Sequence, residues 1–266
     1  VVIASYDFNK FKPQITDLAK QYTGRELAIG GDIELGISLM PTLVVSDVTF
    51  QNADWAKDPH MAKIKRLEVQ IAVLPLLRGN VDVSRAYIEK PEFLIEIDKS
   101  GKSNLEFDAP QEPEQGAPKE KEAGRRHDFF KFKKVQIEGG TITYKDHQRG
   151  MTETISIAIL KFETTEFGAP ANIDLNFSYN KTPFQITGDI GQLSGILNPE
   201  EQWPLNITIA ALDSTVSIQG HVMNIAEAKG IDLKLAVKGS DVGNFQQFTG
   251  EPLPVRGPFE VAGHLN

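Results

Sequence analysis

The chain has 266 residues, of which 40% are hydrophobic and 24% charged, which predicts a folded protein with a sizeable core in one elongated all-β domain or two ordinary domains. Its net charge of -8 argues against nucleic acid as a partner, because a phosphate backbone selects basic surfaces. The absence of cysteine excludes disulfides, thiolate catalysis and sulfur-ligated zinc. The sequence contains no stretch of about 18 apolar residues, the length needed to span a bilayer.

The first and last residues of the sequence each suggest that the chain is part of a longer protein. It opens with VVIAS and no initiator methionine, so residues 1–7 are either the stub left after a hydrophobic anchor was removed or a processed start. The last residues, FEVAGHLN, have the pattern of an interrupted strand, and we expect the natural protein to continue beyond Asn266.

Residues 8–24 are predicted to form an amphipathic helix, because apolar residues recur at helical spacing. The predicted stripe consists of Phe8, Phe11, Ile15, Leu18, Ala19 and Tyr22. Asp7 or Asn9 can cap the start of the helix, and Gly24 stands where a left-handed C-terminal cap is expected. Lysines lie off the stripe, so the helix could lie near an anionic membrane surface. Alternatively, the stripe covers one end of a sheet.

From residue 25 to residue 266 the hydrophobic period changes to two, which predicts an all-β, mainly antiparallel body. Turn residues separate the alternating runs and favour a meander. These turn signals are Gly139-Gly140, Asp146-His147, Asn180-Lys181, Ala211 to Ser214 and Lys229-Gly230.

Three segments depart from the alternation. Leu74 to Asn80 reads as a single helical turn, and residues 108–127 are predicted to be a mobile loop because they hold three prolines, many charges and no large apolar residue. TGDIG, QGHVM and AGHLN each place a glycine inside a predicted strand, at Gly188, Gly220 and Gly263, a pattern typical of a bulge or bend.

No catalytic, metal or cofactor site is predicted. The GKS triplet at Gly101 lacks the first glycine of a phosphate loop and reads as a hairpin turn. GQLSG places its serine one position too late for a nucleophile elbow, and the five histidines lack metal-ligand spacing. No pair of carboxylates can be nominated for acid and base roles.

The first hundred residues contain an ordered series of motifs. These are FKP at Phe11, TGRELAIGGDIEL from Thr23, LMPTL at Leu39, VTFQNADW from Val48, HMAKIKRLEVQIAVLPLLRGNVDV from His60, EKPEFLIEI from Glu89 and GKSNLEF from Gly101. In this order the series resembles the N-terminal region of the AsmA family, large envelope proteins of Gram-negative bacteria. The later part of the chain shares only strand character and the glycine repeats.

The resemblance implies a periplasmic body, anchored to the inner membrane by a helix that would precede Asp7. It implies an elongated, curved, groove-forming sheet, similar to chorein-type bridge proteins, that holds phospholipid or another acyl-chain lipid for transfer between inner and outer membrane. The expected groove wall consists of Leu67, Val69, Ile71, Val81, Val83, Phe93, Ile95, Ile97, Ile155, Ile157, Ile173, Leu175, Phe177, Ile207, Ile209, Leu233 and Leu235. The membrane-proximal helix would use Phe8, Phe11, Ile15, Leu18 and Tyr22.

Alternating strands look the same when two sheets close into a dry β-sandwich, which would leave no groove. The chain could also be a non-lipid structural or regulatory module that contacts envelope proteins in outer-membrane protein assembly through exposed strand edges. A carbohydrate hydrolase would need paired carboxylates in one cleft.

Overall fold

The structure is a computed structural model that describes residues 7–36, 40–72, 81–107, 130–166, 169–192, 202–224, 229–246 and 255–266. The chain divides into two compact units. Unit 1 comprises Val1–Phe130 and Val135–Ile157, and unit 2 comprises Lys131–Lys134 and Ala158–Asn266. Residues 1–6, the segment from Leu74 to Asn80 and the loop predicted at 108–127 lie outside the described residues.

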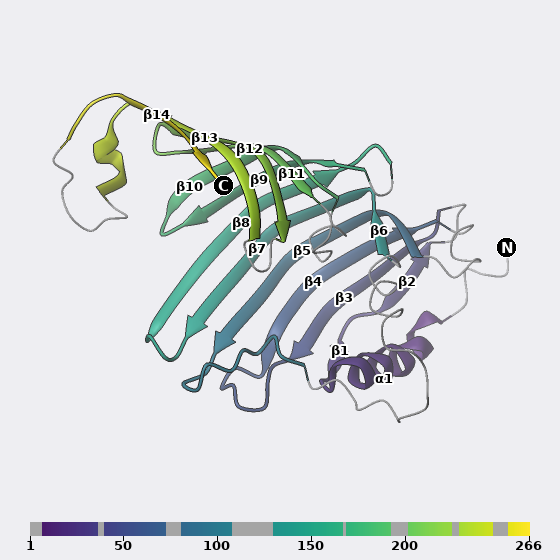
Figure 1. Ribbon diagram of the computed structural model, residues 1–266. Coiled ribbons are helices and arrows are strands. Elements are labelled where there is room, and N and C mark those ends of the chain that lie inside the picture. Colours follow the sequence, from purple (N-terminus) through teal and green to yellow (C-terminus); the bar gives the residue numbers. More distant parts are fainter. Residues whose placement is uncertain are drawn as a thin grey trace, which may run out of the picture. The chain divides into compact units, whose positions relative to one another are not determined.

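Unit 1 is built from one helix and a twisted sheet (Figure 1). Its elements are a 3-10 turn (Phe8–Phe11), α1 (Lys12–Thr23), β1 (Leu27–Ile29), β2 (Ile33–Gly36), β3 (Thr42–Gln51), β4 (His60–Ile71), β5 (Val81–Ile97), β7 (Lys134–Asp146) and the first part of β8 (Met151–Glu163). A short strand, β6 (Phe130–Phe132), pairs with β5. The β1-β3, β2-β3, β3-β4 and β4-β5 pairs are antiparallel, whereas β5 and β7 run parallel.

The predicted N-terminal helix is confirmed. Asp7 accepts a hydrogen bond from the Asn9 backbone N–H at 2.9 Å and so caps the 3-10 turn that leads into α1. Pro13 occupies an early helical position, where its missing N–H costs nothing. Gly24 ends the helix at φ 72°, and its N–H donates to the Lys20 carbonyl at 2.8 Å.

Four neighbouring strands of unit 1 share a displaced pleat. Asp47 in β3, Lys65 in β4, Lys90 in β5 and Gly139 in β7 lie at one level of the register, and three of them have positive φ, at 52° for Asp47, 47° for Lys90 and 67° for Gly139. On either side of this level the apolar positions are three apart instead of two: Val45 and Val48, Ile64 and Leu67, Ile88 and Pro91, Ile137 and Gly140. The shift occurs in all four strands together, which keeps the apolar residues on one face.

Unit 2 is built from antiparallel strands. They are the second part of β8, β9 (Ala171–Tyr179), β10 (Thr182–Ile190), β11 (Trp203–Ala211), β12 (Ser214–Asn224), β13 (Lys229–Gly239) and β14 (Phe259–Leu265), with a short 3-10 helix (Val242–Phe245) before β14. The predicted turn at Asn180-Lys181 joins β9 to β10, and Leu212-Asp213 joins β11 to β12. All four turn residues have φ between 50° and 65°, as tight hairpins require.

Two of the three predicted strand glycines are structurally required. Gly188 in β10 has φ 137° and Gly220 in β12 has φ 148°. A Cβ at Gly188 would lie 2.1 Å from the Asn206 carbonyl oxygen, and one at Gly220 would lie 1.9 Å from that of Asp232. These glycines therefore permit close strand approach, as expected for a bend. Gly263 in the edge strand β14 has open space around it.

The all-β, mainly antiparallel fold class is confirmed. All described strands belong to one 14-stranded sheet, whose order runs β1-β3-β4-β5-β7-β8-β9-β10-β11-β12-β13-β14 and does not return to β1. The sheet is therefore open, and the alternative of two sheets closed into a sandwich is not what the described strands form.

The predicted meander is wrong at one place. β7 lies next to β5 but parallel to it, because β7 begins at the same end of the sheet as β5 does. The predicted turn at Gly139-Gly140 is also wrong, since both glycines lie inside β7 at the displaced pleat. Lys229-Gly230 begins β13 instead of preceding it.

Candidate functional site

The sheet of unit 2 presents an ordered apolar face across six strands. The antiparallel registers of β9 to β14 bring apolar residues into rows that run perpendicular to the strands. One row consists of Leu175, Ile186, Ile209, Val216, Val237 and Val261, the next of Ile173, Gly188, Ile207, Ile218, Leu235 and Gly263, and the third of Ala171, Ile190, Leu205, Gly220, Leu233 and Leu265. The predicted wall residues of β9, β11 and β13 thus share one face.

Most of this face is only partly covered. Within the rows, Ala171 and Ile190 are buried, at 1% and 7% exposure, while the side chains of the central strands β11 to β13 remain half-buried. At the edge, Val261 is 62% exposed and Leu265 49%. Phe177 and Phe184 stack with ring centroids 5.0 Å apart and bound the face beside the β9–β10 turn. Six strands at about 4.8 Å spacing make this face about 24 Å wide.

The opposite face of the same strands is polar. Along β13, Asp232, Lys234 and Lys238 alternate with the apolar set and are exposed. His264 Nε2 lies 2.7 Å from Asp232 Oδ1, and this hydrogen bond lowers the pKa of the Asp232 carboxyl below 3.8. Unit 2 therefore separates a charged face from an apolar one within a single layer.

Unit 1 carries a comparable set of apolar residues. Leu67 lies opposite Val45 and Ile88, and Val69 lies opposite Leu43 and Ala86. The predicted residues Leu67, Val69, Ile71, Ile95 and Ile97 are half-buried, and Phe93 is 37% exposed.

Val83 differs from its predicted partners in the wall. It is only 3% exposed, so no ligand can contact it without rearrangement. The side chain of Val81 lies outside the described part of the structure. Ile155 and Ile157 are half-buried in β8 and alternate with exposed residues.

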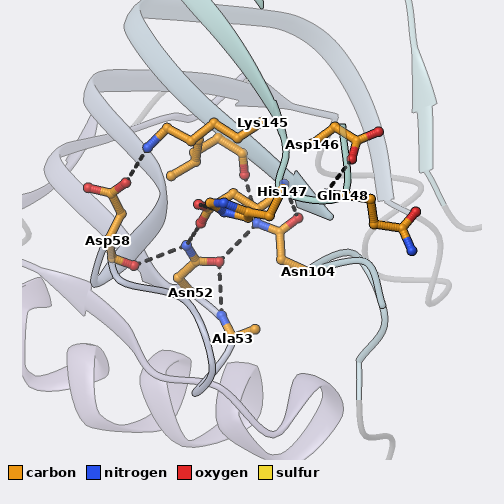
Figure 2. A network of polar contacts seen from close by, with 10 residues as sticks. Asn52, Ala53, Asp58, Asn104, Lys145, Asp146, His147 and Gln148 are labelled. Atoms are coloured by element: carbon orange, nitrogen blue, oxygen red, sulfur yellow. Dashed lines mark hydrogen bonds and ion pairs between the residues drawn. The ribbon is translucent and has the colours of Figure 1, made fainter. Parts of the chain in front are cut away.

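A buried polar network ties together one end of the unit 1 sheet (Figure 2). Glu96, at the end of β5, is 1% exposed. Its Oε2 accepts a hydrogen bond from Asn52 Nδ2 at 2.7 Å, and its Oε1 lies 3.3 Å from His147 Nε2. Asn52 follows β3 and His147 follows β7, so one carboxylate links the ends of three strands.

Asn104 completes the network from the hairpin that follows β5. Its side chain is fully buried and donates to Asn52 Oδ1 at 2.9 Å and to the Leu94 carbonyl at 2.8 Å. The guanidinium of Arg25 donates to the Asn104 carbonyl at 2.6 Å and lies 4.6 Å from the ring centroid of Phe107. Both amides and the carboxylate are engaged in holding chain segments, so the network stabilises the sheet end instead of presenting a reactive group.

This network was not predicted from the sequence. Glu96 alternates with apolar Ile95 and Ile97, which is the pattern of a solvent-facing residue. The predicted hairpin at Gly101 is confirmed, since the Asp98 N–H donates to the Lys102 carbonyl at 2.9 Å. Its consequence could not be read from the sequence, because the hairpin places Asn104 against β5 only after the chain has folded back.

A hollow of about 440 Å³, with charged side chains in its lining, lies beside the network. It is lined by Asp58, Pro59, His60, Lys63, Glu92, Phe93, Leu94, Thr141, Thr143 and Lys145. Its lysines are paired: Lys145 Nζ lies 2.5 Å from Asp58 Oδ2 and Lys63 Nζ lies 3.8 Å from Glu92 Oε2. The hydrogen bond from Lys145 lowers the pKa of the Asp58 carboxyl. Such a charged lining does not suit acyl chains.

The described residues contain no group of three or more His, Asp or Glu side chains placed to hold a metal ion. None of their helices combines the length and apolarity needed to cross a bilayer.

Comparison with known proteins identifies the family. The sequence profile of the AsmA family matches residues 1–242. The chain belongs to the AsmA family. AsmA proteins are bacterial envelope proteins, which suggests a role in envelope biogenesis or lipid transport, and they are not a known enzyme class.

One AsmA relative is similar over the whole chain. The AsmA family protein YhjG of Escherichia coli (strain K12) is 23% identical over 300 residues, a match that covers 100% of this chain and 42% of the relative. The chain thus spans less than half the length of that relative.

Proposed function

We propose that this chain is a non-enzymatic, lipid-binding module of the bacterial envelope. Its apolar sheet faces hold the acyl chains of phospholipid, or of another acyl-chain lipid, for transfer between inner and outer membrane. The observation that carries this proposal is the set of aligned apolar rows in unit 2, whose central side chains stay half-buried instead of interlocking with a second sheet.

The energetics suit a distributed site. Each methylene removed from water is worth about 0.8 kcal/mol, so a face about 24 Å wide can hold a chain without a dominant contact. In unit 2 the contacting residues are Ile173, Leu175, Phe177, Ile207, Ile209, Leu233 and Leu235. In unit 1 they are Leu67, Val69, Ile71, Phe93, Ile95 and Ile97, with Ile155 and Ile157 of β8. Val83 is left out of this set because it is buried.

The proposed location is the periplasm, with attachment to the inner membrane through a segment outside the described residues. This placement is supported by the chain's membership of the AsmA family, which is a family of bacterial envelope proteins. A two-faced sheet is also suited to a watery compartment, because its charged face can be solvated while its apolar face is occupied by lipid.

A second candidate function is favoured by β14. Six of its seven residues are exposed, and among the described strands it pairs only with β13. An unpaired strand edge can accept a strand from another protein, which would suit a structural or regulatory module in outer-membrane protein assembly.

A pair of neighbouring substitutions in β13 tests the lipid proposal. Leu235 belongs to the apolar face, whereas Ala236 next to it is exposed on the opposite face. Native mass spectrometry of gently purified protein should show bound phospholipid in the wild type and in Ala236→Glu. Leu235→Glu should lose most of the lipid, because a carboxylate then lies among the acyl contacts.

Circular dichroism of both variants controls for folding. A folded wild-type protein that carries no lipid, or equal lipid in both variants, would contradict the lipid proposal. Lipid-free protein that binds an envelope protein through β14 would support the second candidate.

A further inference from the structure

The apolar rows of unit 2 form ridges that run across the strands. Neighbouring members of a row lie one strand spacing apart, about 4.8 Å, whereas successive rows are two residues apart along a strand, about 6.6 Å. Carbon atoms of neighbouring groups touch at about 4 Å, so side chains close up within a row and leave a trough between rows. An acyl chain is about as thick as one such contact, and it therefore rests along a trough with its length across the strands.

Across β11 to β14 the three rows enclose two troughs. The middle row reaches β14 at Gly263, and its other members are the half-buried Ile207, Ile218 and Leu235. The outer rows consist of Ile209, Val216, Val237 and Val261 on one side and Leu205, Gly220, Leu233 and Leu265 on the other. Two troughs that run side by side match the two acyl chains of one diacyl lipid.

Gly263 leaves a notch in the middle row. A Cβ at this position would meet no described atom within 4 Å. Two residues away on either side in β14, the apolar side chains of Val261 and Leu265 remain and are 62% and 49% exposed. The ridge between the two troughs is therefore missing at Gly263, and the troughs join there, as two acyl chains join at the glycerol of a diacyl lipid.

The length of the troughs suits one acyl chain. The hydrocarbon core of a bilayer is about 30 Å thick and holds two chains end to end, so one chain spans about 15 Å. The sheet order places β14, β13, β12 and β11 side by side, which gives three strand spacings, or about 14 Å. A chain that starts at Gly263 therefore ends over Ile207 in β11.

We propose that unit 2 holds one diacyl lipid with its glycerol at Gly263 and its two acyl chains across the strands, one on each side of the ridge of Ile207, Ile218 and Leu235. This inference rests on the proposed lipid-binding function and adds the number, the direction and the joining point of the chains. Gly263 is a positioning residue, because any side chain there extends the ridge between the two chains. A lipid with one chain does not need this gap.

Two leucine substitutions in β14 test the role of Gly263. The 266-residue chain is incubated with equal amounts of dipalmitoyl phosphatidylglycerol and palmitoyl lysophosphatidylglycerol, and native mass spectrometry gives the ratio of bound two-chain to bound one-chain lipid. Gly263→Leu should lower this ratio about tenfold, because the second chain loses part of its contact with the face. Ala262→Leu adds the same side chain at an exposed position on the opposite face and should keep the ratio within about twofold of the wild type.

Quenching by spin-labelled diacyl lipid tests the direction of the chains. The protein has no cysteine, so Leu235→Cys and Ile207→Cys each create a single site for a fluorescent label. These positions share one row but lie one and three strands away from Gly263. A spin label near the carbonyl end of the acyl chain should quench position 235 more strongly, and one near the methyl end should quench position 207 more strongly. Chains that run along the strands would give equal quenching at the two positions.

The outcomes separate this inference from the function on which it rests. A folded wild type that binds neither lipid overturns both. A wild type that binds both lipids, with the ratio unchanged in Gly263→Leu or lowered equally in Ala262→Leu, overturns the inference alone, and so does equal quenching at positions 207 and 235. Circular dichroism checks the folding of each variant. The quenching measurement does not depend on Gly263→Leu and decides the direction of the chains by itself.

Discussion

Asn104 pairs with Glu96 as a residue of a neighbouring strand would. Its backbone N–H donates to the Glu96 carbonyl at 2.9 Å, and its side-chain Oδ1 accepts from the Glu96 N–H at 2.9 Å. The register of β4 with β5 ends at the pair of Ala62 and Phe93, so Asn104 supplies the hydrogen bonds that β4 would otherwise have made. One asparagine therefore extends the sheet by a residue pair.

Replacement of Asn104 by alanine should destabilise unit 1. The change leaves the buried Glu96 N–H without its acceptor and removes one of the two donors to Asn52 Oδ1, and we expect a loss of about 3 kcal/mol in the free energy of unfolding. Urea unfolding followed by circular dichroism measures it. Gln148→Ala, which removes an exposed amide nearby, should stay within about 0.5 kcal/mol of wild type. Equal losses in the two variants would show that the network does not support the sheet end.

Gly220→Ala should destabilise unit 2 by more than about 2 kcal/mol. The new Cβ would lie 1.9 Å from the Asp232 carbonyl oxygen, and an L residue is strained at φ 148°. Gly263→Ala is the matched control, since nothing lies within 4 Å of the added Cβ in β14. Thermal unfolding of both variants checks the difference. If Gly220→Ala unfolds at the wild-type temperature, the close approach of β12 and β13 is not required.

Asp98 should contribute to acid sensitivity. The Ser100 hydroxyl, at 2.7 Å, and the backbone N–H groups of the hairpin lower the pKa of the Asp98 carboxyl below 3.8. Because the folded state favours the ionised form, this stabilisation is present above the unfolded-state pKa and is lost as the pH falls through the lower folded-state value.

The urea midpoint of Asp98→Asn should therefore fall less than that of the wild type between about pH 5 and about pH 2. Ser100→Ala should give an intermediate slope, because it removes the strongest of these hydrogen bonds. Parallel curves for wild type and Asp98→Asn would refute the assignment.

Hydrophobic periodicity predicts much of this fold because each strand has one apolar face. The runs around Ile207 and Leu235 fall in strands whose apolar residues align, and helix α1 ends at Gly24 as its left-handed cap requires. The parallel β5-β7 pair is not encoded by local pattern, since it depends on where the long connection returns the chain. Gly139 was misread as a turn because positive φ serves a displaced pleat as well as a hairpin.

The apolar residues of the candidate site could be predicted from the sequence, but the exposure of their side chains could not. Alternation identifies Val83 and Leu235 equally as wall residues, yet Val83 is 3% exposed and Leu235 is half-buried. Burial depends on which segments fold over each part of the sheet, and a single strand sequence does not contain that information. For the same reason the sequence could not decide which members of the α1 stripe pack on β1 and which, such as Leu18, face outward.

Site-specific photocrosslinking in β12 tests the central claim most directly. Ile218 lies in the apolar row with Ile207 and Leu235, while Ser217 beside it is exposed on the opposite face. A photoreactive phenylalanine derivative at position 218 should crosslink to phospholipid in living cells, and the same group at position 217 should not. Equal crosslinking at both positions, or crosslinking at position 218 to protein alone, would contradict the assignment of this face to lipid.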